Sequence, residues 1–219
     1  MTEQIISTTC YRPPSTMIRI FIAVELPPPI QTWVHQRQTL LQAHLDDLQL
    51  SDCIHWTPVA KVHLTLRFLG DTNEVQHAHM VDSLPAIGPG QTPFSLSLQG
   101  LGCFPNWRTP SVVWVGLAGD VAALHHLQAQ TEQIAQSAGF APEHRVFSPH
   151  ITVGKVRHTA SQADLHKVGQ ALKAFQSTLR NTDQPHQSDP FTVDQIVYIQ
   201  SELRPEGARY TPLLYSGFL

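Results

Sequence analysis

Residues 62–70 read Val-His-Leu-Thr-Leu-Arg-Phe-Leu-Gly, which is the pattern of a β-strand with one apolar face. Side chains alternate between the two faces of a strand, so His63 and Thr65 share one face, and Arg67 belongs to the same face. The opposite face is apolar and consists of Val62, Leu64, Leu66 and Phe68. The strand can therefore bury one face in a core while it presents an imidazole beside a hydroxyl on the other.

A second stretch repeats this pattern. Residues 150–153 read His-Ile-Thr-Val, so His150 and Thr152 share one face of a strand. Roughly 0.2 copies of His-apolar-Thr-apolar are expected by chance in a chain of this composition. One copy alone is equally well interpreted as a buried structural histidine, whereas the duplication favours a functional pair. We discount a third His-x-Thr, at residues 55–58, because its proline lacks the backbone donor that an interior strand needs.

Composition limits the compartment and the partners. The 219 residues carry a formal net charge of −3, so no strong basic field exists to hold a long nucleic acid, although a short end or a nucleotide is compatible. Three cysteines without a C-x-x-C spacing argue against a disulfide framework and favour the cytoplasm. No apolar run approaches the length of about 18 residues that spans a membrane, and no leader pattern is present. We therefore expect a soluble protein without membrane association.

The order of predicted elements indicates an α+β fold. Residues 1–16 are polar and aperiodic and are expected to form a mobile arm, followed by a single bilobal domain over 17–219. Strands are predicted at 18–25, 54–56, 62–70, 94–101, 112–117, 150–153, 191–200 and 210–219. Helices are predicted over 30–48, from a cap at Asp71 or Thr72 to 84, over 120–139 and over 161–175, with a loop at 176–190. Each half contains a long helix followed by a His-x-Thr strand, which indicates two pseudo-equivalent lobes that meet at these strands.

The two motifs resemble the signatures of the 2H phosphoesterase superfamily. Their context resembles the bacterial and archaeal RNA 2′,3′-cyclic phosphodiesterases, also called 2′-5′ RNA ligases, over about residues 17–219. The residues that carry the resemblance are Arg19 to Leu26, Trp56, His63 to Gly70, Ser148 to His150, Ser201, Gly207, Tyr210 and Thr211. The resemblance implies two pseudo-symmetric lobes, each an antiparallel sheet with outer helices, around a central cleft that carries both motif strands.

The resemblance also implies an activity. It is the metal-independent opening of a 2′,3′-cyclic phosphate at an RNA end to leave a 2′-phosphate. We further expect RNA 3′ ends, short oligonucleotides or nucleotides as substrates, no cofactor, and a monomer. His63 is implied as general acid and His150 as general base, with Thr65 and Thr152 as phosphate ligands. The residues themselves suit this chemistry, because two imidazoles with pKa values near 6.5 can remove and deliver a proton near neutral pH.

The sequence departs from the family pattern after the second motif. The family commonly has an arginine five residues after the second histidine, where this chain has Lys155, which supplies charge but no bidentate fork. Strict alternation turns Lys155 away from the cleft, but the preceding Gly154 favours a bulge, so we predict that Lys155 faces the phosphate. Arg67 is the rival source of a phosphate-binding cation.

Several alternatives remain open on the sequence. Phe21, Trp56 or Phe104 can stack a base or belong to the core. Thirteen histidines also allow a divalent-metal hydrolase, although His77 with His79, and His125 with His126, have spacings that diverge on a helix. A non-catalytic nucleotide or RNA-end binder and a 2′-5′ RNA ligase are the further possibilities.

Overall fold

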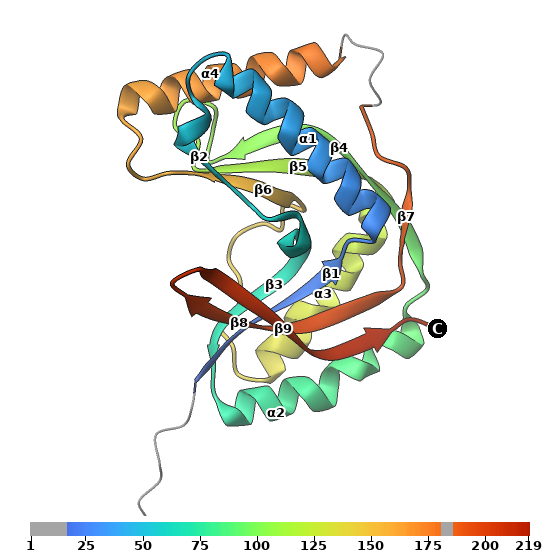
Figure 1. The fold of residues 1–219 in the computed structure, drawn as a ribbon. Helices are drawn as coiled ribbons and strands as arrows, with labels where there is room; N and C mark the ends of the chain where they lie inside the picture. The colour runs from blue at the N-terminus through green and yellow to red at the C-terminus, as the bar shows by residue number, and fades with distance from the viewer. Residues whose placement is uncertain (1–16, 181–185) are drawn as a thin grey trace, which may run out of the picture.

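The computed structural model describes residues 17–180 and 186–219, so the arm predicted at 1–16 lies outside the described residues. Within them, one curled, antiparallel sheet runs in the order β7-β4-β5-β6-β3-β1-β8-β9, with β2 paired to β6, and four helices cover its outer faces (Figure 1). The strands are β1 (Ile18–Glu25), β2 (Ile54–Trp56), β3 (His63–Thr72), β4 (Phe94–Phe104), β5 (Val112–Gly119), β6 (Ile151–Val156), β7 (Phe191–Val193), β8 (Gln195–Arg204) and β9 (Gly207–Gly217). The helices are α1 (Pro28–Asp46), α2 (Glu74–Ser83), α3 (Val121–Ser137) and α4 (Gln162–Arg180). The α+β class is confirmed.

The molecule has two lobes, as predicted, but neither lobe is one half of the chain. One lobe contains β1, β3, β8 and β9 with α2 and α3, and the other contains β2, β4, β5, β6 and β7 with α1 and α4 (Figure 1). Helix α1 precedes β3 yet packs with α4 on the lobe of β6, and α3 precedes β6 yet packs on β3. The chain therefore crosses between the lobes before each motif strand.

The two lobes join at one point of the sheet. Strands β3 and β6 pair only through Leu64 and Ile151. These are the apolar residues inside the two His-x-Thr motifs, and their neighbours in sequence point to the opposite face. The single pairing thus brings both motif histidines and both motif threonines to one cleft.

A bulge changes the alternation in β3. Its pairing with β1 shifts by one residue between Thr65 and Arg67, so that Leu66 and Arg67 both turn to the buried side. Phe68 returns to the cleft side and is 45% exposed. The prediction that Arg67 shares the face of His63, with Phe68 on the apolar face, is therefore wrong, because strict alternation ends at the bulge.

Strand β6 has the corresponding bulge. Its pairing with β5 shifts at Val153, so Val153 and Gly154 are both buried and Lys155 returns to the cleft side. A Cβ atom on Gly154 would lie 2.8 Å from a methyl carbon of Ile54 and 3.2 Å from the ring of Trp56. Glycine at this position allows β2 to lie close to β6.

The helix termini follow local sequence signals. Asp120 caps α3 by accepting a hydrogen bond from the backbone of Ala123 at 2.9 Å, as predicted. The cap of α2 is Asn73 and not the predicted Asp71 or Thr72, and it forms a reciprocal capping box with Gln76.

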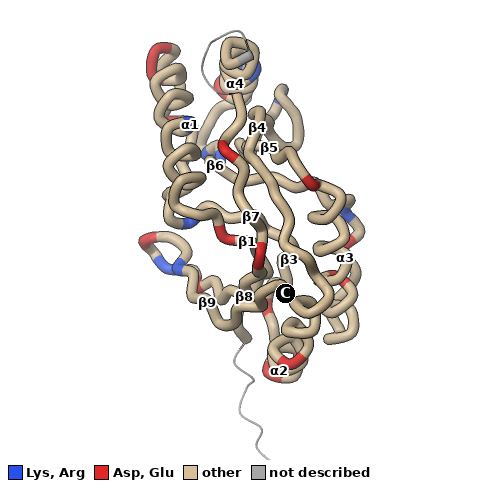
Figure 2. The backbone as a smooth tube through the Cα atoms, turned by 90° about the vertical axis from the view of Figure 1, so that its right-hand side faces the viewer, with Lys and Arg blue, Asp and Glu red and all other residues tan. Residues whose placement is uncertain are grey.

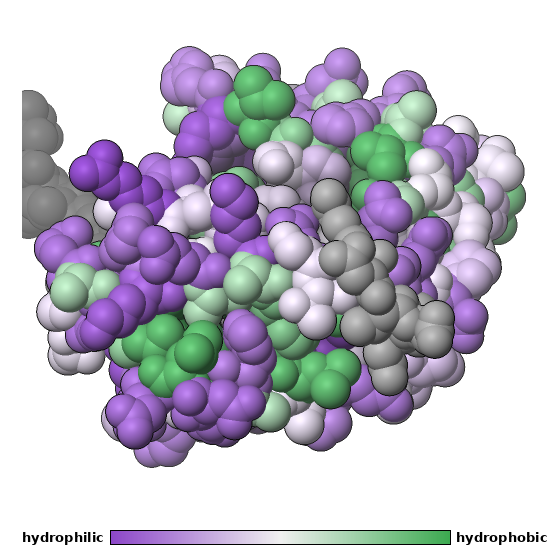
Figure 3. All heavy atoms as spheres, turned by 90° about the horizontal axis from the view of Figure 1, so that it is seen from above, coloured by the Kyte–Doolittle hydropathy of each residue, from purple (hydrophilic) through white to green (hydrophobic). Residues whose placement is uncertain are grey.

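Two predicted boundaries near the end of the chain differ from the structure. Helix α4 continues to Arg180, so residues 176–180 of the predicted loop are helical. The strand predicted over 191–200 is two strands, because β7 pairs with β4 in one lobe and β8 pairs with β1 in the other. The outer surface over α1 and α4 is mostly hydrophilic, with separate apolar patches (Figure 3). None of the described helices is long and apolar enough to cross a membrane.

Candidate active site

The two motif strands line one cleft of about 450 Å³ between the lobes. His63 and Thr65 reach it from β3, and Thr152 reaches it from β6, with His150 directly before that strand. The other polar or aromatic residues that line it include Arg19, Phe21, His55, Lys61, Phe68, Lys155, Ser201, Glu206 and Tyr210. The cleft therefore combines the two motif imidazoles and that of His55 with several hydroxyls and several cations.

Both histidines are oriented by the same local contact, between Nδ1 and the backbone carbonyl oxygen two residues earlier. The Nδ1 of His63 lies 2.8 Å from the carbonyl oxygen of Lys61, and the Nδ1 of His150 lies 2.7 Å from that of Ser148. A carbonyl oxygen only accepts hydrogen bonds, so Nδ1 carries the proton in both rings. The remaining nitrogen, Nε2, is left to exchange a proton: neutral, it is a base, and protonated, it is an acid.

The surroundings of the two histidines differ. His63 stacks on Phe21, with ring centres 4.7 Å apart, and meets Tyr210 edge-on at 5.5 Å. Burial lowers the pKa of His63, its hydrogen bond to Lys61 partly opposes that shift, and the charge of nearby His150 adds to it. His150 instead meets the ring of Phe104 edge-on at 4.9 Å.

The cleft is positively charged although the whole chain is not. Its charged lining residues are the cations Arg19, Lys61 and Lys155 and the carboxylate of Glu206. Elsewhere the basic residues are spread over both lobes (Figure 2). Low-dielectric walls strengthen the field of such a cluster, so an anion is attracted to the two motifs.

Phe68 is an aromatic surface in this cleft that sequence reasoning missed. Phe68 is 45% exposed, and the guanidinium carbon of Arg19 lies 4.8 Å from the centre of its ring. Only the bulge in β3 turns the ring into the cleft, and alternation gave no signal of it. Arg19 is the one cation of β1, whose other residues are apolar up to Glu25.

His55 also lines the cleft, although we discounted its motif. It lies on β2, opposite Lys155 in the pairing with β6. Within the described sheet β2 pairs with β6 alone, and such an edge strand tolerates the proline that follows it. An edge-strand interpretation of residues 55–58 would have identified this histidine.

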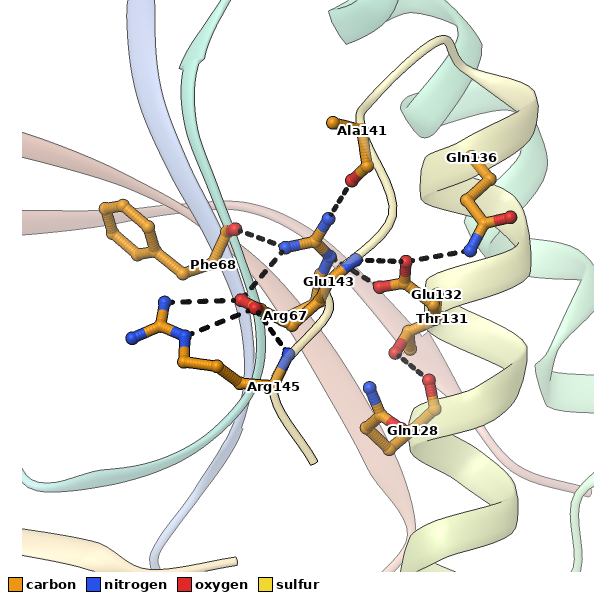
Figure 4. Close-up of polar contacts among 9 residues, drawn as sticks. All are labelled: Arg67, Phe68, Gln128, Thr131, Glu132, Gln136, Ala141, Glu143 and Arg145. Carbon is orange, nitrogen blue, oxygen red and sulfur yellow. Dashed lines mark hydrogen bonds and ion pairs between the residues drawn. The ribbon is translucent and has the colours of Figure 1, made fainter. Parts of the chain in front are cut away.

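Arg67 lies away from the cleft. Its Nε is 2.6 Å from a carboxylate oxygen of Glu132, and its Nη2 donates a hydrogen bond to the carbonyl oxygen of Ala141 at 2.6 Å (Figure 4). The guanidinium thus faces α3 and the segment that follows it, on the other side of the sheet from His63. Its expected role as a phosphate ligand is corrected accordingly, and Lys155 is the motif-strand cation that lines the cleft.

The structure does not present Phe21 or Trp56 as an open face for a base. Phe21 is 3% exposed because it is covered by His63 and Tyr210. Trp56 packs over Gly154 and lines a separate groove beside α1. Phe104, the third candidate, packs against His150.

The histidines considered for metal binding lie elsewhere. His77 contacts the hydroxyl of Tyr198 at 3.2 Å, and His79 contacts the hydroxyl of Ser137 at 2.9 Å. In the described part of the chain, no three or more His, Cys, Asp or Glu side chains form a group that could hold a metal ion.

The fold and the paired motifs define a two-histidine phosphoesterase of the 2H class. Two copies of the family model described as LigT like Phosphoesterase match residues 28–114 and 115–210. The chain belongs to this family.

Similar proteins agree with this assignment. An RNA 2′,3′-cyclic phosphodiesterase of Methanothermobacter thermautotrophicus is 28% identical over 198 residues, which cover 90% of this chain and 96% of that protein. One of Aeropyrum pernix is 38% identical over 95 residues, but this match spans only 43% of this chain and 53% of the relative. The crystal structure of E. coli LigT complexed with 3′-AMP matches with a TM-score of 0.68 at 21% identity, over 93% of this chain and 99% of that one, and supports the fold.

Proposed function

We propose that this protein is a hydrolase that opens 2′,3′-cyclic phosphates on RNA 3′ ends, short oligonucleotides or nucleotides, and leaves a 2′-phosphate. The relatives described above are named for RNA 2′,3′-cyclic phosphodiesterase activity. The observation that carries the proposal is the pair of histidines that donate Nδ1–H to backbone carbonyls and so keep Nε2 for proton transfer in a cationic cleft.

The chemistry follows from these two nitrogens. Water attacks phosphorus opposite the 3′ oxygen, Nε2 of His150 removes a proton from the water, and Nε2 of His63 delivers a proton to the departing 3′ oxygen. The hydroxyls of Thr65 and Thr152 and the ammonium of Lys155 stabilise the charge that develops on the non-bridging oxygens. No step in this scheme uses a metal ion.

The general acid must be protonated when substrate is bound, yet burial lowers the pKa of His63 in the free protein. The anionic phosphate of the bound substrate opposes this lowering, because a nearby negative charge stabilises the imidazolium of His63 and raises its pKa. Binding of the correct anion thus charges the acid that the reaction needs.

The size and charge of the cleft fit a chain end rather than a long duplex. A volume of about 450 Å³ accommodates a ligand of nucleotide size. We further propose that the enzyme works as a monomer in the cytoplasm, where its two described cysteines, Cys53 and Cys103, stay reduced.

The test is turnover of a nucleoside 2′,3′-cyclic phosphate and of a short RNA that ends in one. We expect hydrolysis that persists in EDTA, with a 2′-phosphate as the product in ³¹P NMR spectra. A need for added Zn²⁺ or Mn²⁺ would favour a metal hydrolase, and binding without turnover would favour a non-catalytic RNA-end binder. Joining of a 5′-hydroxyl RNA to the cyclic end would identify ligation.

A further inference from the structure

The segments that cross between the lobes are each tied to a motif strand by a polar side chain on the preceding helix. In the crossing from α1 to β3, the amide of Gln38 donates hydrogen bonds to the carbonyl oxygens of Thr57 and Val153, both at 2.8 Å. In the crossing from α3 to β6, a carboxylate oxygen of Glu132 accepts a hydrogen bond from the backbone of Glu143 at 3.0 Å, and its other oxygen contacts Arg67. The contacts of Glu132 with Arg67 thus form an ionic tie between a crossing segment and a motif strand, whereas the tie made by Gln38 is neutral.

Arg67 is the centre of the ionic tie (Figure 4). Its guanidinium contacts Glu132 on α3, the carbonyl of Ala141 and, at 3.7 Å, the carboxylate of Glu143. It also donates a hydrogen bond to the carbonyl oxygen of Phe68 on its own strand at 3.1 Å. The side chains of Arg67 and Glu132 are only 9% and 15% exposed, so water competes little with the contacts between them.

The segment that Arg67 holds leads directly to the second histidine. Residues 141–146 are exposed, and Val146 is 91% exposed, so this segment has little packing of its own. Its described anchors are the contacts of Arg67 and Glu132 at 141–143 and, at its far end, Phe147, which packs against the hydrophobic core with its ring 5.4 Å from that of His125. The next residue, Ser148, supplies the carbonyl oxygen that orients His150.

A buried ion pair contributes little net stability compared with apolar residues of similar volume, so the role of this one is sought in the geometry of its partners. We propose that Arg67, together with Glu132, is a positioning residue that sets the orientation of His150 from the strand that carries His63. This inference rests on the proposed function. Arg67 touches neither the cleft nor the histidine, and acts through the segment from Ala141 to Ser148.

The test is the paired replacement Arg67→Met with Glu132→Leu, which removes both charges and keeps an apolar filling. Removing one partner alone leaves a buried charge and destabilises the fold, whereas the pair can keep the wild-type melting temperature. At equal melting temperature we expect kcat to fall about 10- to 100-fold, because misplacement of a catalytic group by about 1 Å has that effect. KM should change less than about twofold, because the phosphate ligands are untouched.

A spectroscopic measurement tests the orientation without relying on turnover. In ¹⁵N NMR spectra of the imidazoles, His150 of the wild-type protein should be held as the Nδ1–H tautomer, and the paired variant should show a mixture of tautomers. The signals of His63 should not change. If the wild-type protein lacks hydrolysis, the proposed function fails, but these signals still decide the positioning role.

Matched variants complete the design. Arg145→Met removes an arginine that lies in the segment itself. Its side chain is 89% exposed, pairs with Glu143 and does not contact Arg67, so this variant should leave kcat and the His150 signals unchanged. Arg67→Lys keeps the buried charge but cannot span the same acceptors, so it should fold and lose kcat even if the paired variant does not fold. Wild-type kcat or unchanged His150 signals in the folded paired variant, or in Arg67→Lys, would overturn the proposal.

Discussion

The two motif strands have the same backbone features and differ in the residues around them. In both, the histidine donates Nδ1–H to the carbonyl two residues earlier, and a bulge follows the threonine. Beyond the bulge, the residue that returns to the cleft is Phe68 in one strand and Lys155 in the other. The repeated element therefore holds two histidines in the same local orientation, and the residues after the bulge give one lobe an aromatic surface and the other a cation.

The buried positions inside the two bulges differ as strongly. In β3 this position holds Arg67, which pairs with Glu132 across to α3. In β6 it holds Gly154, over which Trp56 packs. The same backbone irregularity thus accepts an ion pair on one side and a close approach of strand β2 on the other.

The largest expected effect tests whether the two histidines form one unit. His63→Ala and His150→Ala should each lower kcat/KM by about 10²- to 10⁴-fold, because each removes a proton-transfer group. The double variant should be little worse than either single variant, since groups that act together are not additive. Steady-state kinetics and circular dichroism of the folded variants provide the measurement, and near-normal turnover of either one contradicts the paired mechanism.

The next prediction distinguishes the contribution of Lys155 to substrate binding from that of Phe68. Lys155→Ala should raise KM and lower kcat, with a loss of about 1.5 to 3 kcal/mol in kcat/KM, because it removes a charged donor to phosphate. Lys155→Arg should preserve or improve kcat/KM, because the guanidinium restores a bidentate fork.

Phe68→Ala is the matched change in the first strand. It should weaken the binding of nucleotide substrates by about 1 to 3 kcal/mol and leave the affinity for inorganic phosphate unchanged, because an exposed aromatic ring offers a stacking surface to a base but none to phosphate. For the second strand, kinetics of Lys155→Ala that equal those of the wild type would contradict the assignment of the phosphate-binding cation to Lys155.

The threonines should behave alike. Thr65→Val and Thr152→Val keep shape and β-propensity but delete a hydroxyl donor, so each should reduce kcat/KM by about 1 to 2 kcal/mol, because water in an open cleft partly replaces the donor. Melting temperatures should change little. Unchanged kinetics in both variants would show that the threonines are structural.

The smallest effect concerns the pH dependence of stability. Because burial lowers the pKa of His63 in the folded protein, the unfolded chain binds a proton at this residue first as the pH falls through about 6.5. The free energy of unfolding should therefore decrease with falling pH in this range, and His63→Gln should reduce that decrease. Thermal unfolding between about pH 7.5 and 5.5 measures both slopes. An equal or steeper slope in the variant would contradict the role assigned to burial.

The sequence alone predicted most of the elements and the two motifs that line the cleft. Apolar alternation and β-branched residues predict the strands, and the cap at Asp120 predicts the start of α3, because these signals act over a few neighbouring residues. The duplication of His-x-Thr predicts the pair that lines the cleft. Gly154 indicated where the second strand departs from alternation, because a glycine inside a strand often marks a bulge. The structure adds the reason for glycine there, since a Cβ atom would lie too close to Ile54 and Trp56.

The tertiary structure decided which residues join that pair. No local signal marked the bulge in β3, since a register shift depends on pairing with β1, and so Phe68 and Arg67 exchanged faces relative to the prediction. The lobes are interleaved because α1 and α3 each cross to the other lobe, and the partner of Arg67 is therefore a glutamate 65 positions later, Glu132. Contacts between residues so far apart follow from the packing of whole elements, which the periodicity of a single segment does not encode.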